Sequence, residues 1–254
     1  MSSTLGLHST GITRVVGDAG LHLEPTKRVI DIVPSKKSRL VFATEPEGLA
    51  VEQYKLVRRR LRALHPEGGV MLITSPSPGE GKTLTSVNLG WCLAEGGHRT
   101  CLVDLDFRAP GVSPTLGYDF EEDGVEDVLN GKITASEAIR QIGDGSYYVL
   151  GVRKRVPSPG DILSPSYLTP LLDKLRTMFQ WVIVDSAPII PMADVAEILP
   201  QVDGALMVVR AGKTEEALIA PALEILGAKV WGMVMNDCPI NGSSYYGYYG
   251  NRKK

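Results

Sequence analysis

The first sustained pattern of apolar and polar residues along the chain predicts an amphipathic helix between Glu47 and Pro66. Apolar side chains recur there at helical intervals, at Leu49, Val51, Leu56, Val57, Leu61 and Leu64. Proline ends the run because it cannot donate the next helical hydrogen bond. Residues 55–60 give this helix a basic face, which is compatible both with simple solvation and with a contact between subunits.

Beyond Pro66, short apolar runs alternate with helical stretches. The runs occupy residues 70–73, 101–103, 148–150, 181–184, 205–209 and 233–235. They lack the alternation of a half-exposed strand, which is typical of parallel strands covered by helices on both faces. The pattern therefore predicts a three-layer α/β fold with a mostly parallel central sheet flanked by helices. In such sheets ligands bind beyond the carboxyl ends of the strands, so the residues after each run are the first candidates for a site.

The length of 254 residues fits one folded unit with tails. We expect a largely flexible N-terminal extension over 1–45, a single domain over 46–240 and a separate tail over 241–254. The formal net charge of −2 argues against a general nucleic-acid binder. The three cysteines lie far apart, without zinc-ligand spacing, and no apolar run has the roughly 18 residues that a membrane span needs. We therefore expect a cytoplasmic protein. If it works at a membrane, a partner would have to hold it there.

A phosphate-binding loop is predicted directly after the first of these apolar runs, from Thr74 to Thr83. Two glycines let the backbone approach phosphate oxygens closely, and amides at the start of the following helix supply donors. Lys82 would neutralise the β- and γ-phosphates, and the Thr83 hydroxyl would coordinate Mg²⁺. Pro76 stands where this loop usually begins with glycine, so a chance turn containing Gly-Lys-Thr is the alternative interpretation.

Carboxylates follow two other apolar runs. Asp104 and Asp106 are two residues apart, so both can project from one face of an extended chain into a nucleotide cleft. Two acids there can divide the work, one holding hydrated Mg²⁺ and the other accepting a proton. Asp185 follows four apolar residues, as in the Walker B arrangement, where an aspartate reaches Mg²⁺ directly or through water. The combination predicts a site for ATP and Mg²⁺.

The C-terminal end is rich in tyrosine. Of the nine tyrosines in the chain, four fall in the last ten residues, at Tyr245, Tyr246, Tyr248 and Tyr249. Glycines interrupt the run and nothing alternates, so it is a poor core strand and is typical of a mobile tail. Its tyrosines are interpreted as phosphate acceptors, with an inert tail as the alternative.

Together these motifs resemble the bacterial tyrosine kinases of capsule and exopolysaccharide synthesis. The resemblance runs from about Glu47 to the C-terminus and rests on the loop SxxPGxGKT, the strand ends DxDxR and DSAP, and the tail. Family members tolerate a residue other than glycine at the first loop position, which accounts for Pro76. The resemblance implies a protein-tyrosine autokinase on a P-loop ATPase fold, which uses ATP and Mg²⁺ to phosphorylate its own tail between subunits.

The resemblance also implies roles for individual residues. Lys82, Asp104, Asp106 and Asp185 would be catalytic, with Asp104 activating the incoming tyrosine hydroxyl. Asp106 and Asp185 would hold the waters of a metal that Thr83 also binds. The residues implied to contact the nucleotide are Ser77, Pro78, Gly79, Glu80, Gly81, Lys82, Thr83, Leu84, Arg108 and, at the adenine, Asn236.

Partners are implied in the same way. Relatives carry an ExxRxxR pattern, associated with ring-like homo-oligomers in which one subunit's tail enters a neighbour's site. Here Lys55 replaces the middle arginine between Glu52 and Arg58; lysine keeps the charge but loses the bidentate fork, so we expect weaker or altered assembly. A membrane-anchored regulator of polysaccharide chain length as activator and a cognate tyrosine phosphatase are also implied. The protein would then work in the cytoplasm or at the inner face of the membrane, without nucleic acid.

Two other functions stay open from the sequence. Partition and septum-positioning ATPases usually place a second lysine early in the loop, whereas residues 75–78 read Ser-Pro-Ser-Pro. A non-enzymatic ATP-sensing scaffold would use the tail as a docking peptide. Unchanged behaviour of Asp104→Asn in every assay would favour that last function.

Overall fold

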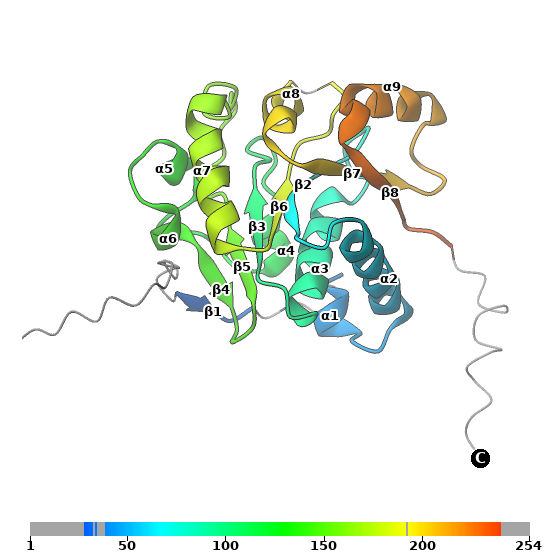
Figure 1. The fold of residues 1–254 in the computed structure, drawn as a ribbon, viewed down its shortest axis with the longest axis horizontal. Helices are drawn as coiled ribbons and strands as arrows, with labels where there is room; N and C mark the ends of the chain where they lie inside the picture. The colour runs from blue at the N-terminus through cyan, green and yellow to red at the C-terminus, as the bar shows by residue number, and fades with distance from the viewer. Residues whose placement is uncertain (1–27, 33, 35–38, 192, 240–254) are drawn as a thin grey trace, which may run out of the picture.

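An eight-stranded sheet forms the centre of the computed structural model, which describes residues 28–32, 34, 39–191 and 193–239 (Figure 1). Its strand order is β1-β4-β5-β3-β6-β2-β7-β8, and all neighbours are parallel except β4 and β5. The strands are β1 Val29–Ile30, β2 Gly69–Thr74, β3 Thr100–Asp104, β4 Arg140–Ile142, β5 Tyr147–Leu150, β6 Trp181–Asp185, β7 Gly204–Arg210 and β8 Val230–Asn236.

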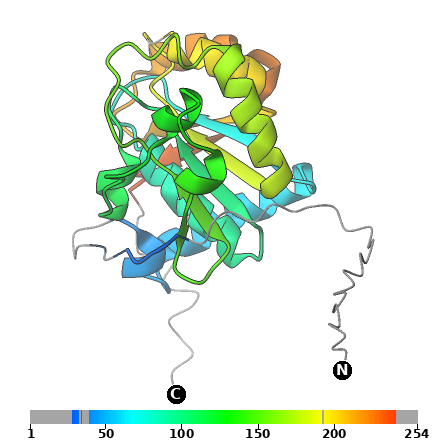
Figure 2. The same cartoon turned by 90° about the vertical axis from the view of Figure 1, so that its left-hand side faces the viewer.

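Helices cover both faces of this sheet, which makes three layers (Figure 2). Successive strand residues face opposite layers: Val70 belongs to the core cluster that includes residues of α5 to α9, whereas Met71 belongs to the cluster that includes residues of α2 to α4. The helices are α1 Val41–Thr44, α2 Leu49–Leu64, α3 Lys82–Glu95, α4 Val112–Leu116, α5 Val125–Leu129, α6 Ala135–Ala138, α7 Pro165–Met178, α8 Asp194–Ile198 and α9 Glu216–Leu226, with 3-10 turns at Leu199–Gln201 and Gly227–Lys229.

The predicted elements agree with this architecture. All six apolar runs lie in strands, in β2, β3, β5, β6, β7 and β8, and the predicted amphipathic helix is α2. The sequence did not indicate β1 and β4, because strands of two and three residues are too short to show a period. Among the six predicted strands, β8 departs most from the buried pattern: it is at the edge of the sheet, and Met233 and Met235 are 49% and 58% exposed.

The folded unit begins before residue 46, the start expected from the sequence. Strand β1 pairs with β4, and both Leu40 and Phe42 are buried in the core. These short apolar segments lie among loop-like residues, which hides them from a periodicity argument. The expected flexible extension lies largely, and the tyrosine-rich tail wholly, outside the described residues.

A charge cluster at Asp127 supports the packing of α5. Its carboxylate accepts two hydrogen bonds from Arg153, at 2.8 and 3.1 Å, and one from Lys132 at 3.0 Å. Arg153 first, and then Lys132, lower the pKa of Asp127 to about 2. This interaction therefore stabilises the fold above the unfolded-state pKa of roughly 4 and is lost as the pH falls toward 2.

Asp127→Asn is expected to lower the free energy of unfolding at pH 7 by about 1–2 kcal/mol, because Arg153 loses its bidentate charged partner and keeps only the longer contact with Glu126. The measurement is urea unfolding at several pH values from 7 to 3, with the exposed Asp161→Asn as a matched control. The gap between wild type and Asp127→Asn should shrink at the acid end. A gap that is the same at pH 7 and pH 3 would contradict the assignment.

Candidate active site

The predicted phosphate-binding loop joins β2 to the N-terminus of α3. Gly81 has a φ of +95°, a left-handed conformation that favours glycine, and a Cβ at this position would collide with the Asn236 amide. Lys82 is the first residue of α3 and is 7% exposed. The hydroxyl of Thr74 donates to the carbonyl of Ala187 at 3.0 Å, which fixes the loop against the end of β6. The loop thus presents a helix N-terminus and one buried cation to an anion.

Asp185 lies at the end of β6, beside the start of α3. Its two oxygens accept hydrogen bonds from the hydroxyls of Thr83, at 2.7 Å, and Ser86, at 2.8 Å. Burial raises the pKa of Asp185 to about 6, although Lys82 and the two hydroxyls act in the opposite direction. Sequence reasoning missed Ser86; its spacing of three residues from Thr83 on one helix face was the available signal.

Asp104 is the register partner of Asp185 on the neighbouring strand β3 and is fully buried. Its oxygens accept hydrogen bonds from the amides of Asp106, at 3.0 Å, and Val112, at 3.2 Å. Burial, and then the nearby charge of Asp185, raise the pKa of Asp104 well above its usual range. The carboxylate therefore binds a proton more readily than an exposed aspartate does.

Asp106 completes this acidic cluster. It is 5% exposed, and its carboxylate accepts the amide of Ala109 at 3.0 Å. Burial raises the pKa of Asp106, while the Ala109 hydrogen bond and the charge of Lys82 lower it. The strands β3 and β6 thus bring the three predicted acids to one edge of the sheet, together with Lys82.

These residues fit a magnesium–nucleotide complex. Among the described residues, no group of three or more His, Cys, Asp or Glu side chains is arranged as a metal site by itself. Mg²⁺ needs less from a protein, because it is usually bound by one or two carboxylates, with phosphates and waters as the other ligands. The Thr83 hydroxyl touches Asp185, and burial raises the pKa of Asp104 and Asp185 even though the charge of Lys82 opposes it at Asp185. A divalent cation would supply further positive charge.

Comparisons with known proteins agree with the geometry. The model of the CobQ/CobB/MinD/ParA nucleotide binding domain matches residues 71–239, which confirms the P-loop fold. Tyrosine-protein kinase YwqD of Bacillus subtilis (strain 168) is 34% identical over 225 residues, covering 86% of this chain and 94% of that protein. The chain belongs to the bacterial tyrosine kinases.

Solved structures support the same assignment. The kinase domain of VpsO superposes with a TM-score of 0.69 at 26% identity, covering 78% of this kinase and 99% of that chain. Cobyrinic acid a,c-diamide synthase from Mycobacterium smegmatis, solved with an ATP analog and magnesium, has a TM-score of 0.54 at 22% identity, over 65% of this kinase and 70% of that chain. That second likeness shows a shared fold alone. The sequence relatives therefore favour a kinase over a partition-type ATPase.

Arg108 of the kinase forms an ion pair with another residue of the same chain. Its guanidinium donates two hydrogen bonds to Asp194, at 2.7 and 3.0 Å, and one to the carbonyl of Pro157 at 2.9 Å. Asp194 is the first residue of α8 and is 2% exposed. The structure thus shows Arg108 tying the loop after β3 to α8, while the nucleotide contact implied for it remains a prediction.

Arg108→Lys is expected to lower the kinase rate about tenfold, because lysine cannot reproduce the bidentate contact that holds the loop of Asp106. Initial phosphorylation rates measure this, with the exposed Arg155→Lys as the matched control. Equal rates for Arg108→Lys and wild type would show that this contact does not position the loop.

The remaining implied nucleotide contacts line two different grooves. One groove, of about 370 Å³, is lined by Ser77, Pro78, Gly79 and Glu80 together with Arg210, Lys213 and Glu215. Leu84 and Asn236 line the second groove, and the Asn236 amide donates to the Glu80 carbonyl at 3.0 Å. The Glu80 carboxylate is buried and has no hydrogen-bond partner in the described part of the kinase.

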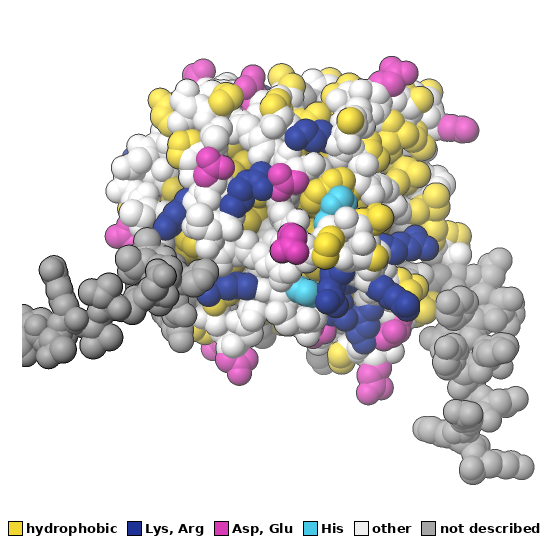
Figure 3. Space-filling model, in the orientation of Figure 1, with side chains coloured by type: hydrophobic (Ala, Val, Ile, Leu, Met, Phe, Trp, Pro, Cys, Tyr) yellow, Lys and Arg dark blue, Asp and Glu magenta, His cyan; other side chains and the backbone are white. Residues whose placement is uncertain are grey.

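Helix α2 carries the predicted basic face, and Figure 3 shows Lys and Arg side chains gathered over it. Two residues of the ExxKxxR pattern pair within the helix: Lys55 donates to Glu52 at 2.7 Å. Arg58 turns toward the protein and donates to the carbonyl of Cys92 at the end of α3, at 2.6 Å. Arg58 therefore holds α2 against α3, and the exposed arginines of the basic face are Arg59 and Arg60, with Arg62 exposed just beyond it.

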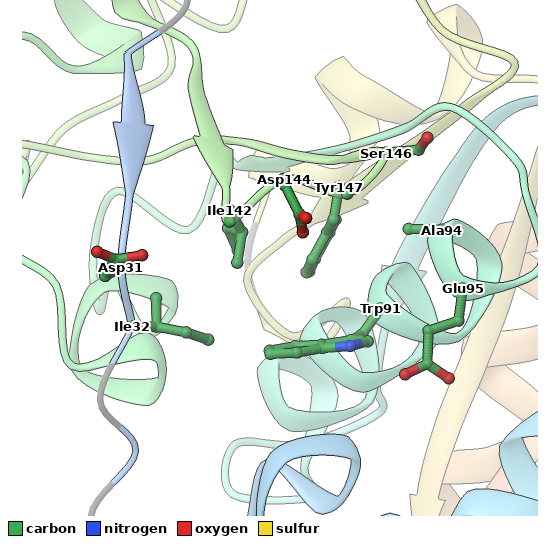
Figure 4. Close-up of a pocket in the computed structure, with 11 residues that line it drawn as sticks. Asp31, Ile32, Trp91, Ala94, Glu95, Ile142, Asp144, Ser146 and Tyr147 are labelled. Atoms are coloured by element: carbon green, nitrogen blue, oxygen red, sulfur yellow. The ribbon is translucent and has the colours of Figure 1, made fainter.

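A further pocket of about 300 Å³ is lined by the carboxyl-terminal half of α3 (Figure 4). Trp91 and Tyr147 form part of its wall, and the acids Asp31, Glu95 and Asp144 surround it without a lysine or arginine among the described lining residues. Three carboxylates would repel a triphosphate. The pocket does not suit ATP, in contrast to the loop at the other end of α3.

Proposed function

We propose that this kinase uses ATP and Mg²⁺ to phosphorylate the tyrosines of its own C-terminal tail between subunits, and thereby regulates capsule or exopolysaccharide synthesis. The observation that carries the proposal is that most tyrosines of the described residues are not exposed. Of the five tyrosines in the described ranges, only Tyr167 is exposed, at 50%. Tyr147 and Tyr148 are buried, and Tyr54 and Tyr118 are partly buried. The four tail tyrosines are then the main remaining acceptors.

The acidic cluster suits this transfer. Lys82 and the amides at the start of α3 would hold the phosphates, and Thr83, Asp106 and Asp185 would hold Mg²⁺. Bound Mg²⁺ would neutralise charge that builds up on the phosphates during transfer. The tyrosine oxygen would bond to the γ-phosphorus as the bond to the ADP oxygen breaks, and the phenolic proton would pass to Asp104.

The raised pKa of Asp104 supports that last role. A phenol has a pKa near 10, so a carboxylate with a higher pKa is a better partner for its proton than an ordinary aspartate. The amides of Asp106 and Val112 each occupy one acceptor site on a different Asp104 oxygen, so each oxygen keeps a second lone pair that could accept the incoming hydroxyl.

A mixing experiment tests transfer between subunits. Lys82→Met supplies an intact tail without a working site, and the fourfold Tyr→Phe variant at 245, 246, 248 and 249 supplies a working site without acceptors. The two are mixed with Mg-ATP, and the peptide after Cys238 is analysed by mass spectrometry. Phosphotyrosine on the Lys82→Met tail is expected. An unmodified tail in the mixture, beside a labelled wild-type tail, would show transfer within one subunit instead.

A membrane partner is part of the proposal. Within the described residues, no helix combines the length and the apolar character needed to cross a bilayer. In this proposal a membrane-anchored regulator of chain length activates the kinase and a tyrosine phosphatase resets it. Homo-oligomers would form through α2, where the internal pair of Glu52 and Lys55 competes with pairing between subunits.

A further inference from the structure

Two side chains outside the acidic cluster contact the outer side of the phosphate-binding loop. Arg210 is the last residue of β7, and its guanidinium donates to one oxygen of Asp237 from Nε, at 2.9 Å, and from Nη2, at 2.7 Å. Its third nitrogen, Nη1, lies 3.5 Å from the carbonyl oxygen of Gly79. Arg210, at the end of β7, thus joins Asp237, the residue after β8, to the loop.

The neighbouring strand end contacts the next loop carbonyl. Asn236 is the register partner of Arg210, and its side chain donates to the carbonyl of Glu80 at 3.0 Å. The amide of Ala211 donates back to the carbonyl of Asn236 at 2.9 Å. The ends of β7 and β8 therefore hold two consecutive carbonyls of the loop, and the pair of Arg210 with Asp237 links those two ends.

The backbone at Asp237 has an unusual conformation. Asp237 has a φ of +56° and is the one non-glycine residue with positive φ in the described part of the chain. Such a conformation is uncommon outside glycine, although aspartate and asparagine tolerate it best. The hydrogen bond from Arg210, and then its charge, lower the pKa of Asp237, so the carboxylate is held ionised beside the guanidinium.

We propose that Arg210 is a positioning residue for nucleotide binding, and that its pair with Asp237 clamps the loop carbonyls of Gly79 and Glu80. A peptide group is planar, so fixing a carbonyl also fixes the direction of the next amide. The amides of this loop are the groups that face phosphate in the proposed ATP site. The inference rests on that proposed ATP binding.

The clamp acts on ground state and transition state alike, because loop amides would contact the phosphates in both. Loss of such uniform binding raises KM and leaves kcat nearly unchanged. Arg210→Gln is expected to raise the Kd and KM for Mg-ATP about fivefold or more, with kcat changed by less than about twofold.

Lys213→Gln is the matched control. Lys213 is an exposed cation that lines the same groove, and it has no side-chain hydrogen bond in the described part of the structure. Both variants lose one positive charge near the loop. If the charge alone attracted ATP, the two would weaken binding equally, which would overturn the proposal. We expect Lys213→Gln to stay within about twofold of wild type.

A double-mutant cycle tests the pair. Asp237→Asn keeps a residue that tolerates positive φ but removes the charge, and it should weaken ATP by a smaller factor than Arg210→Gln. Because the two residues act as a unit, the double variant should bind no worse than Arg210→Gln alone. Losses that simply multiply would contradict the clamp.

Two further measurements keep the test independent of folding and of kinase activity. Thermal unfolding checks that each variant is intact, and Arg210→Lys, which keeps the charge without the fork, should give an intermediate Kd. Binding of a fluorescent ATP analogue is measured on the full chain, with Lys82→Met as the non-binding reference. If the tail were not phosphorylated, the proposed function would fail but the Kd values could still be compared. Equal Kd values for wild type and Arg210→Gln would reject the clamp without affecting the proposed function.

Discussion

Lys82→Met is expected to reduce tail phosphotyrosine by at least about a hundredfold, the scale of losing one preorganised group that stabilises developing charge. Lys82 is nearly buried at the start of α3, and its charge lowers the pKa of both Asp106 and Asp185. Methionine has a similar length but no charge. The variant would therefore lose the contact with the phosphates and would also leave the acidic cluster without its cation.

The measurement for Lys82→Met is the initial rate of phosphate incorporation with Mg-ATP, followed by mass spectrometry of the tail. Lys154→Met is the control, because it makes the same replacement at an exposed loop position. Unfolding temperatures show whether Lys82→Met is folded. If folded Lys82→Met were labelled at more than about a tenth of the wild-type rate, Lys82 would not be a catalytic residue.

The fourfold change of Tyr245, Tyr246, Tyr248 and Tyr249 to Phe is expected to remove most incorporated phosphate while leaving ATP affinity unchanged. Each substitution deletes only the acceptor oxygen and keeps the ring. Tyr167→Phe is the matched control, because Tyr167 is the exposed tyrosine within the described residues. It should retain nearly all labelling.

Total phosphate and its position should be measured together in this experiment. Strong labelling of the fourfold variant would refute the tail as the acceptor. If that label moved to Tyr167, the acceptor would lie on α7. ATP hydrolysis in wild type without any phosphotyrosine would instead favour a switch ATPase.

Most of the sheet could be predicted from local sequence, because strands buried on both faces need continuous apolar residues. Six of the eight strands contain such an apolar run, although β8 at the edge of the sheet is only partly buried. Strands β1 and β4 contain none, since they have two and three residues; β1 is the edge strand and β4 lies between it and β5. Only pairing in the folded state distinguishes them from loops.

Part of the candidate site could also be predicted from the sequence. The loop through Lys82 and Thr83, and the acids after β3 and β6, were identifiable because each follows directly from its own strand. Their convergence was also expected, since carboxyl ends of parallel strands meet at one edge of a sheet. The sequence by itself thus determined the fold class, the nucleotide loop and the candidate catalytic acids.

Tertiary structure decided which partner each charged group finds. Arg108 and Asp194 are separated by 86 residues, and Arg210 and Asp237 by 27, and no local pattern pairs them. The complete burial of Asp104, which raises its pKa, likewise depends on strands and helices from distant parts of the chain. The sequence specifies the type of each residue, but the electrostatic environment of that residue depends on neighbours that only folding brings within a few ångströms.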